Sequence, residues 1–222
     1  TLSSNTQIPR STIYNAKKHF DVATWTGNNT AGRLIPLEFK PDFVWVKCRT
    51  AGHDHQVTDS VRGSSKALAA NLNAAEVDWD VLYSGNNKGM GDYVDGGFIL
   101  DDDGNNARYN NTGQSYVAWC WKAGGAAVSN SDGSITSSVS ANQEAGFSIV
   151  TWTGSGADAS IGHGLGKKPE VLFVKSRTND DNWKVWFKGV TTDDSYSFQL
   201  DNNGANYSGS DKWYNSPNGN DT

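Results

Sequence analysis

Several residue types that mark common protein classes are scarce in this sequence. It has two cysteines, one methionine and five prolines, and strong helix formers are sparse outside residues 64–77. Lysine and arginine number 19 against 24 aspartates and glutamates, with no basic block or stripe, so nucleic acid is not expected as a partner. No apolar run approaches the roughly 20 residues that a membrane-spanning helix needs, so membrane insertion is not expected either.

Glycine and aromatic residues are abundant instead. The 222 residues include 24 glycines and nine tryptophans, and 11% of the chain is aromatic. Short runs rich in Val, Thr and aromatic residues alternate with Gly- and Asn-containing turns at intervals of roughly ten residues. This pattern predicts an all-β protein made of antiparallel β-sandwich or jelly-roll-like domains. The composition is closer to that of a secreted or virion β-protein than to that of a cytosolic enzyme.

The sequence repeats itself once, at an offset of 127 or 128 residues. Residues 20–27 (FDVATWTG) return as 147–154 (FSIVTWTG), and residues 40–50 (KPDFVWVKCRT) return as 168–178 (KPEVLFVKSRT). A solenoid unit has roughly 20 to 50 residues, so this longer offset predicts two tandem copies of one β-module. Helix and strand both stay open for residues 64–77, because the equivalent stretch of the second copy has the composition of a strand.

The repeat also sets the expected domain organisation. A polar N-terminal segment is expected at residues 1–19, the first β-domain copy at 20–125, a linker at 126–145 and a truncated second copy at 146–222. The linker is small and polar, although Ile135 and Val139 could dock it onto a neighbouring domain. The patterns at residues 98–100 and 116–121 should recur beyond residue 222, so the chain is expected to be a segment of a longer polypeptide.

Catalytic motifs are not recognisable. The sequence has no nucleophile elbow, phosphate-binding loop or zinc-protease motif. Cys48 and Cys120 each fall in a strand-like run, where a free thiol behaves as a small apolar residue. A disulfide bond between them stays open, but Ser176 replaces Cys48 in the second copy, so the fold does not require one. Nothing singles out a pair for glycoside hydrolysis among Asp21, Asp42, Glu76, Asp78, Asp80, Asp92 and Asp95.

Two clusters have the composition of metal ligands. His53 and His55, with Asp59 nearby, could share a cation, because alternate residues of a strand point to one face; in a trimer, the ion could lie between chains. Asp101 and Asp103 belong to an oxygen-rich stretch bent by glycine, which suits calcium. A polar loop and an ordinary Asp-Gly turn explain the same residues without a metal. No cofactor is therefore expected, with Ca²⁺ or an inter-subunit metal as the alternatives.

Aromatic residues in polar surroundings are candidates for glycan binding. An exposed ring can stack on a sugar face while neighbouring amides and carboxylates bind the hydroxyl groups. Burial between subunits or against the neighbouring domain is the alternative for each ring. The candidates are Trp79, Tyr83, Trp183, Trp186, Tyr207, Trp213 and Tyr214.

Four motifs together carry a resemblance to a known module. They are residues 147–154, 163–169 (HGLGKKP), 174–177 (VKSR) and 116–124 (YVAWCWKAG). As a set they resemble a β-module of unassigned function that recurs in structural and tail-fibre-like proteins of marine tailed phages, especially phages of cyanobacteria. The resemblance covers almost everything from Phe20 onward. It implies a virion or extracellular location, and it brings no established catalytic residues.

The resemblance and the duplication together favour a non-enzymatic viral structural protein. The chain is expected to be part of a phage tail fibre or related appendage, held in a homo-oligomer, most simply a homotrimer, beside other virion proteins. It would contribute to host attachment, with host surface glycans as partners. A lectin-like carbohydrate-binding module for receptor recognition and a polysaccharide depolymerase are the alternatives. Duplication favours the first two roles, because a second copy adds length or avidity directly.

Overall fold

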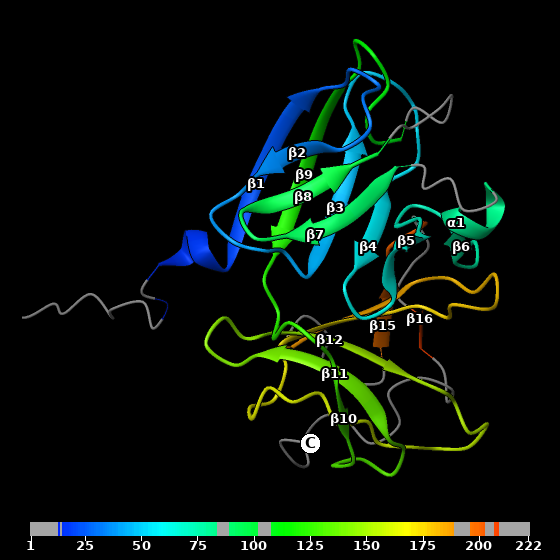
Figure 1. Ribbon diagram of the computed structural model, residues 1–222. Coiled ribbons are helices and arrows are strands. Elements are labelled where there is room, and N and C mark those ends of the chain that lie inside the picture. Colours follow the sequence, from blue (N-terminus) through cyan, green and yellow to red (C-terminus); the bar gives the residue numbers. More distant parts are fainter. Residues whose placement is uncertain are drawn as a thin grey trace, which may run out of the picture.

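Figure 1 shows the computed structural model, which describes residues 13, 15–83, 89–101, 108–188, 196–202 and 207–208. The described chain is nearly all β and its sheets are antiparallel, so the predicted all-β, sandwich-like class is confirmed. No helix in these ranges is long and apolar enough to cross a membrane. The elements are η1 (Ala16–Lys18), β1 (Phe20–Thr26), β2 (Arg33–Pro36), β3 (Phe43–Cys48), β4 (Gln56–Asp59), β5 (Gly63–Leu68), β6 (Val77–Asp78), α1 (Trp79–Leu82), β7 (Met90–Val94), β8 (Gly97–Leu100), β9 (Ser115–Trp121), β10 (Val128–Asn130), β11 (Ser137–Asn142), β12 (Phe147–Trp152), β13 (Val171–Val174), β14 (Lys184–Phe187), β15 (Tyr196–Gln199) and β16 (Tyr207–Ser208).

The first copy consists of two sheets that share one core. One sheet has the strand order β1-β9-β3-β4-β5-β6 and the other β2-β8-β7. Successive side chains of a strand face opposite sides, so β9 turns Tyr116, Ala118 and Cys120 inward, where each is fully buried. These residues join Trp25 of β1 and Phe98 of β8 in one apolar cluster. Burial of each large side chain contributes about 1.5–3 kcal/mol, which makes β9 central to this copy.

The second copy repeats part of this topology. Its strands form two sheets in the orders β10-β11-β12 and β13-β14-β15-β16. Phe43 of β3 lies opposite Asp59 of β4, and Val171 of β13 lies opposite Phe187 of β14, which is the same register at the repeat offset. The strand pairing is therefore duplicated together with the sequence.

A lysine contact in the following loop is also duplicated. Nζ of Lys47 donates to the backbone carbonyl of Ala51, and Nζ of Lys175 donates to that of Asn179. In both copies the lysine closes the loop that leaves the strand. This contact gives the repeated Val-Lys motif a structural role.

The segment expected as a linker, residues 126–145, is not an irregular connector. It contributes β10 and β11, and β11 pairs with β10 on one side and with β12 of the second copy on the other. A strand forms here because Val139 is buried and because the hydroxyl of Ser137 donates to the carbonyl of Gly162. Residues 64–77 likewise form no helix: β5 occupies residues 64–68, an irregular stretch follows, and β6 begins at Val77.

Aromatic packing closes the junction between the copies. The ring of Phe147, the first residue of β12, has its centroid 5.7 Å from that of Phe43 and 5.9 Å from that of Trp121. Gly124, between β9 and β10, has no room for a side chain, since a Cβ would lie 2.5 Å from the carbonyl oxygen of Ala141. Packed atoms therefore join the two copies in addition to the chain itself.

Candidate functional site

Four charged side chains form a network between the copies. The guanidinium of Arg62 donates from Nε to Oδ2 of Asp59 at 2.5 Å and from Nη1 to Oε2 of Glu76 at 2.9 Å. Glu76 also accepts two hydrogen bonds from Arg177, 2.9 Å from Nε and 2.7 Å from Nη2. One carboxylate thus connects an arginine of the first copy with an arginine of the second.

Local turns place these charges. Asp59 ends β4, and its Oδ1 accepts the backbone N–H groups of Val61 and Arg62, which closes the turn into β5. Arg177 follows β13, and its carbonyl accepts the backbone N–H of Glu76 at 2.8 Å. The side chain of Arg62 is 4% exposed and that of Arg177 is 40% exposed, so the network runs from the interior to the surface.

The electrostatics of the network are balanced. Burial alone would raise the pKa of Glu76, but hydrogen bonds from Arg177 and Arg62 outweigh burial and hold that pKa below its ordinary value of 4.5. Burial also disfavours the charged form of Arg62, yet the charges of Asp59 and Glu76 raise the pKa of its guanidinium. Two cations and two anions compensate one another, so the cluster acts as a structural junction and presents no free acid or base.

Neutral hydrogen bonds extend this junction. Oδ1 of Asp180 accepts the backbone N–H of Ala75, and its carbonyl accepts from Nδ2 of Asn73. Nε1 of Trp183 donates to the carbonyl of Ala69 at 2.9 Å. The loops that follow β5 in the first copy and β13 in the second are therefore bonded side by side.

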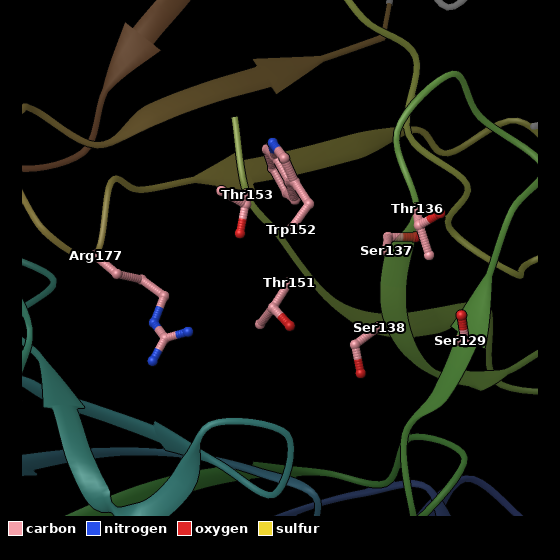
Figure 2. A pocket seen from close by; sticks show the side chains of 8 residues that line it. All are labelled: Ser129, Thr136, Ser137, Ser138, Thr151, Trp152, Thr153 and Arg177. Atoms are coloured by element: carbon pink, nitrogen blue, oxygen red, sulfur yellow. The ribbon is translucent and has the colours of Figure 1, made fainter. Parts of the chain in front are cut away.

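An open pocket with a volume of about 380 Å³ is lined by residues of β10 to β12 and by Arg177, which follows β13. Figure 2 shows hydroxyl-bearing side chains from β10 to β12 on one side and Arg177 reaching in from the other. Trp152 adds an indole that is 41% exposed. The pocket is lined by Ser129, Thr136, Ser137, Ser138, Thr151, Trp152, Thr153 and Arg177.

Two tryptophans proposed from sequence as glycan platforms are buried. Trp183 is 6% exposed and Trp186 is 1% exposed. The indole of Trp183 is held by its hydrogen bond to Ala69. Val185, which lies between the two tryptophans in the sequence, is also buried. A ring face that is covered by protein cannot stack on a sugar. In this structure the two rings serve packing.

Trp79 and Tyr83 are not among the residues that line the pocket. Trp79 is 5% exposed, and the guanidinium carbon of Arg108 lies 5.1 Å from its ring centroid. Tyr83 stacks on Trp79 with 6.1 Å between ring centroids and is half-buried. Trp213 and Tyr214, and the side chain of Tyr207, lie outside the described residues.

The proposed histidine cluster does not converge on one point. Nε1 of Trp45 donates to Nδ1 of His55 at 2.9 Å, while the backbone carbonyl of His53 accepts from Lys47. Burial lowers the pKa of His55, as does the positive charge of Lys47, which favours the neutral ring. Asp59 is engaged in the charge network. In the described ranges, no group of three or more His, Cys, Asp or Glu side chains has the arrangement of metal ligands.

The remaining candidates have structural surroundings. Asp101 directly follows β8, and its backbone N–H donates to the carbonyl of Gly89 at 2.9 Å. Asp103 lies outside the described residues. Cys48 and Cys120 are free, buried thiols, and Val44 rather than Cys48 lies opposite Cys120 in the sheet.

Sequence reasoning missed both the network and the pocket. From the sequence, Glu76 was one of seven carboxylates considered for glycoside hydrolysis. Trp152 was included only within the repeated residues 147–154. The available signal was the arginine repeated as Arg49 and Arg177. In the second copy the side chain of Arg177 contacts Glu76, and in the first copy the backbone N–H of Arg49 donates to the carbonyl of Ser115.

Fold and site together define a tandem all-β module whose copies share a charged, hydrogen-bonded junction. The chain belongs to the family described as Domain of unknown function (DUF7483), which matches residues 15–222 and so spans both copies. Searches of curated proteins and of solved structures found no match.

Proposed function

We propose that this chain is a non-enzymatic viral structural protein, a segment of a phage tail fibre or related virion appendage that contributes to host attachment. The observation that carries the proposal is the junction between the copies, in which Glu76 pairs with Arg62 and Arg177 while Phe147 packs on Trp121. A rigidly joined pair of modules suits a part that transmits position over distance. The resemblance to tail-fibre-like proteins supports the location on a virion.

The charged groups of the junction support a non-enzymatic role. A general acid or base must be free to exchange a proton with a substrate. Glu76 and Asp59 instead direct their oxygens at guanidinium groups and backbone N–H groups. These carboxylates stabilise the fold.

Carbohydrate binding at the pocket is the second candidate function. The pocket combines hydroxyl groups, which can exchange hydrogen bonds with a sugar, and the half-exposed indole of Trp152, which offers an apolar face. The guanidinium of Arg177 donates two hydrogen bonds to Glu76, so the positive charge of Arg177 is already compensated. A neutral saccharide therefore fits this pocket better than an acidic one.

Two measurements on the same sample test these functions. Light scattering gives the mass in solution, and a glycan array with product analysis detects binding and cleavage. A stable trimer without glycan signal supports the structural role alone. A saturable signal that Trp152→Ala abolishes and the distant Val81→Ala preserves supports the carbohydrate-binding role as well. Release of shortened glycan would overturn the proposal in favour of a depolymerase.

A further inference from the structure

The chain enters and leaves the first copy at the same end of its larger sheet. Phe20, the first residue of β1, lies opposite Trp121, the last residue of β9. Directly beyond this pair, the backbone N–H of Lys122 donates to the carbonyl of His19 at 2.8 Å. The second copy adjoins the same end, because Phe147 of β12 packs on Trp121. The loops at the other ends of β1, β3 and β9 are therefore remote from this contact.

Hydrogen bonds connect these loops into one cluster, which we call the loop end. It comprises residues 27–32, 49–52 and 110–114. β1 and β9 have seven residues each, so a rise of about 3.3 Å per residue puts the loop end roughly 20 Å from the contact with the second copy. Figure 1 shows the loop end at the top and β10 to β12 at the bottom. The backbone N–H of Gly27 donates to the carbonyl of Gln114 at 2.8 Å, which joins two of the loops.

A buried asparagine fixes the shape of the loop end. Asn110 is fully buried; its Oδ1 accepts the backbone N–H of Asn28 at 3.2 Å, and its Nδ2 donates to the carbonyl of Thr30 at 3.1 Å. The carbonyl of Asn110 also accepts the backbone N–H of Asn29 at 2.7 Å. One residue thus holds three successive positions of the first loop. Groups that are already ordered lose little conformational entropy when a ligand binds them.

Comparison of the copies separates what the first turn requires from what the loop end adds. Oδ1 of Asn28 accepts the backbone N–H of Thr30 at 3.1 Å. At the corresponding position of the second copy, Oγ of Ser155 accepts the backbone N–H of Ala157 at 3.3 Å. A serine therefore suffices for this turn. Asn28 is exposed and adds an NH₂ group, from which no described residue accepts a hydrogen bond.

The next position gives the same result for the backbone. Asn29 has a φ of 53°, and Gly156, its counterpart in the second copy, has a φ of 77°. Glycine adopts this left-handed conformation without steric cost, whereas asparagine tolerates it at some cost. The fold therefore accepts the smaller residue, and Asn29 carries an exposed amide that the turn does not need. Residues held in such conformations cluster at functional sites.

A third amide group comes from Gln114. The backbone N–H of Ser115 donates to the hydroxyl of Thr50 at 3.0 Å, so that hydroxyl is left to donate to Oε1 of Gln114 at 2.7 Å. This bond fixes the orientation of the amide and leaves its NH₂ group without an acceptor among the described residues. Thr112, two residues earlier, is exposed. The loop end thus presents three amides and a hydroxyl on a fixed backbone.

The chemistry of the loop end fits a neutral, hydroxyl-rich ligand. Side-chain amides both donate and accept hydrogen bonds, as sugar hydroxyl groups do. Arg49 is the single charged residue of the three loops, so they lack the cluster of cations that would favour an acidic polysaccharide. None of the large apolar side chains that are exposed in the described chain belongs to the loop end, whereas a protein partner would need such anchors.

We propose that the loop end of the first copy binds neutral glycans through the side-chain amides of Asn28, Asn29 and Gln114. The amides donate to hydroxyl and ring oxygens and accept from hydroxyl groups. Each loop end binds weakly, because its loops contain no aromatic ring for stacking, and several chains in one appendage raise the affinity through avidity. The inference rests on the attachment role proposed above, and its surface shares no residue with the lining of the pocket.

Exchange of residues between the copies tests this surface. Asn28→Ser combined with Asn29→Gly gives the first copy the residues of the second, so the turn and its backbone conformation are kept while both amides are removed. The probes are a glucan, a mannan and a galactan, first on an array and then in solution, where NMR titration measures the affinity. Binding of at least one probe is expected. The double variant should weaken it by about tenfold or more, because two hydrogen bonds are lost, with no change in melting temperature.

Two further variants serve as controls. Asn179→Ala is matched to the double variant, since it replaces an exposed asparagine of the second copy by alanine, the residue at the corresponding position 51 of the first copy. Trp152→Ala changes the pocket and leaves the loop end intact. Both controls should bind the glycan as tightly as the wild type.

Three results would overturn the inference: no probe binds, the double variant binds as tightly as the wild type, or Trp152→Ala alone abolishes binding, which would assign it to the pocket. Light scattering separates these results from failure of the proposed function. A stable trimer that binds no glycan would keep the structural role and remove this surface. A monomer that binds glycan through the loop end would keep this surface and remove the trimer.

Discussion

Replacement of Glu76 by glutamine is the sharpest test of the junction between the copies. Glu76→Gln keeps the size of the side chain and removes the charge that Arg62 and Arg177 share. A hydrogen bond between charged groups contributes about 1.5–3 kcal/mol when it is buried, as the bond to Arg62 is. The pair with Arg177 adds at most about 1 kcal/mol, because that arginine is 40% exposed. Glutamine retains one acceptor oxygen, so we expect a loss of about 2–3 kcal/mol in the free energy of unfolding.

The loss should depend on pH in a defined direction. The folded-state pKa of Glu76 lies below 4.5, so its stabilising effect is fully present above 4.5 and disappears as pH falls through the folded pKa. Urea unfolding followed by tryptophan fluorescence, at neutral pH and well below pH 4.5, measures the difference between wild type and variant. Glu170→Gln is the control, since Glu170 is exposed and pairs with Lys188 on the surface; it should leave the midpoint unchanged. An equal effect of the two substitutions, or a Glu76 effect that persists undiminished in acid, would refute the reasoning.

Three further outcomes are expected. Trp186→Ala, at a 1% exposed position, should lower the free energy of unfolding by about 3–5 kcal/mol through the cavity it leaves, as measured by chemical denaturation. Cys48 and Cys120 should resist an aqueous thiol reagent in the folded protein and react after unfolding, because both are buried and burial raises the pKa of Cys120; rapid reaction in native buffer would contradict their placement. The ring of His55 should titrate below its ordinary pKa of 6.5 by NMR, because burial and Lys47 disfavour its charged form.

The sequence predicts local structure well where the pattern is carried by the strand itself. Alternating or continuous apolar runs predict strands where β1, β3 and β9 lie, and the structure adds that β13 and β14 pair in the same register as β3 and β4. Strands without such a pattern depend on the strands that lie beside them. The serine-rich stretch that becomes β11 has weak strand propensity of its own, and it forms a strand because β12 lies beside it.

The candidate site was less predictable, because burial depends on partners far away in the sequence. Trp25 and Trp152 are the second residue of the same Thr-Trp-Thr-Gly motif, yet Trp25 is packed against Tyr116 and Phe98 whereas Trp152 is exposed. Trp183 and Trp186 lie in a polar stretch and are nevertheless buried, and the indole of Trp183 donates a hydrogen bond to Ala69 of the first copy. Local composition reports which rings are present, but the tertiary contacts decide which of them reach solvent.

The packing of Gly124 against Ala141 has a mechanical consequence. There is no space for even a methyl group at this point, so this close contact opposes rotation of one copy against the other about the chain that joins them. Tension applied along the polypeptide would meet the ring contacts of Phe147 and the arginine bonds of Glu76 before the joining segment could straighten. The pair should therefore bear load as one stiff rod, and repeated modules joined in this way would keep a fixed twist from one to the next.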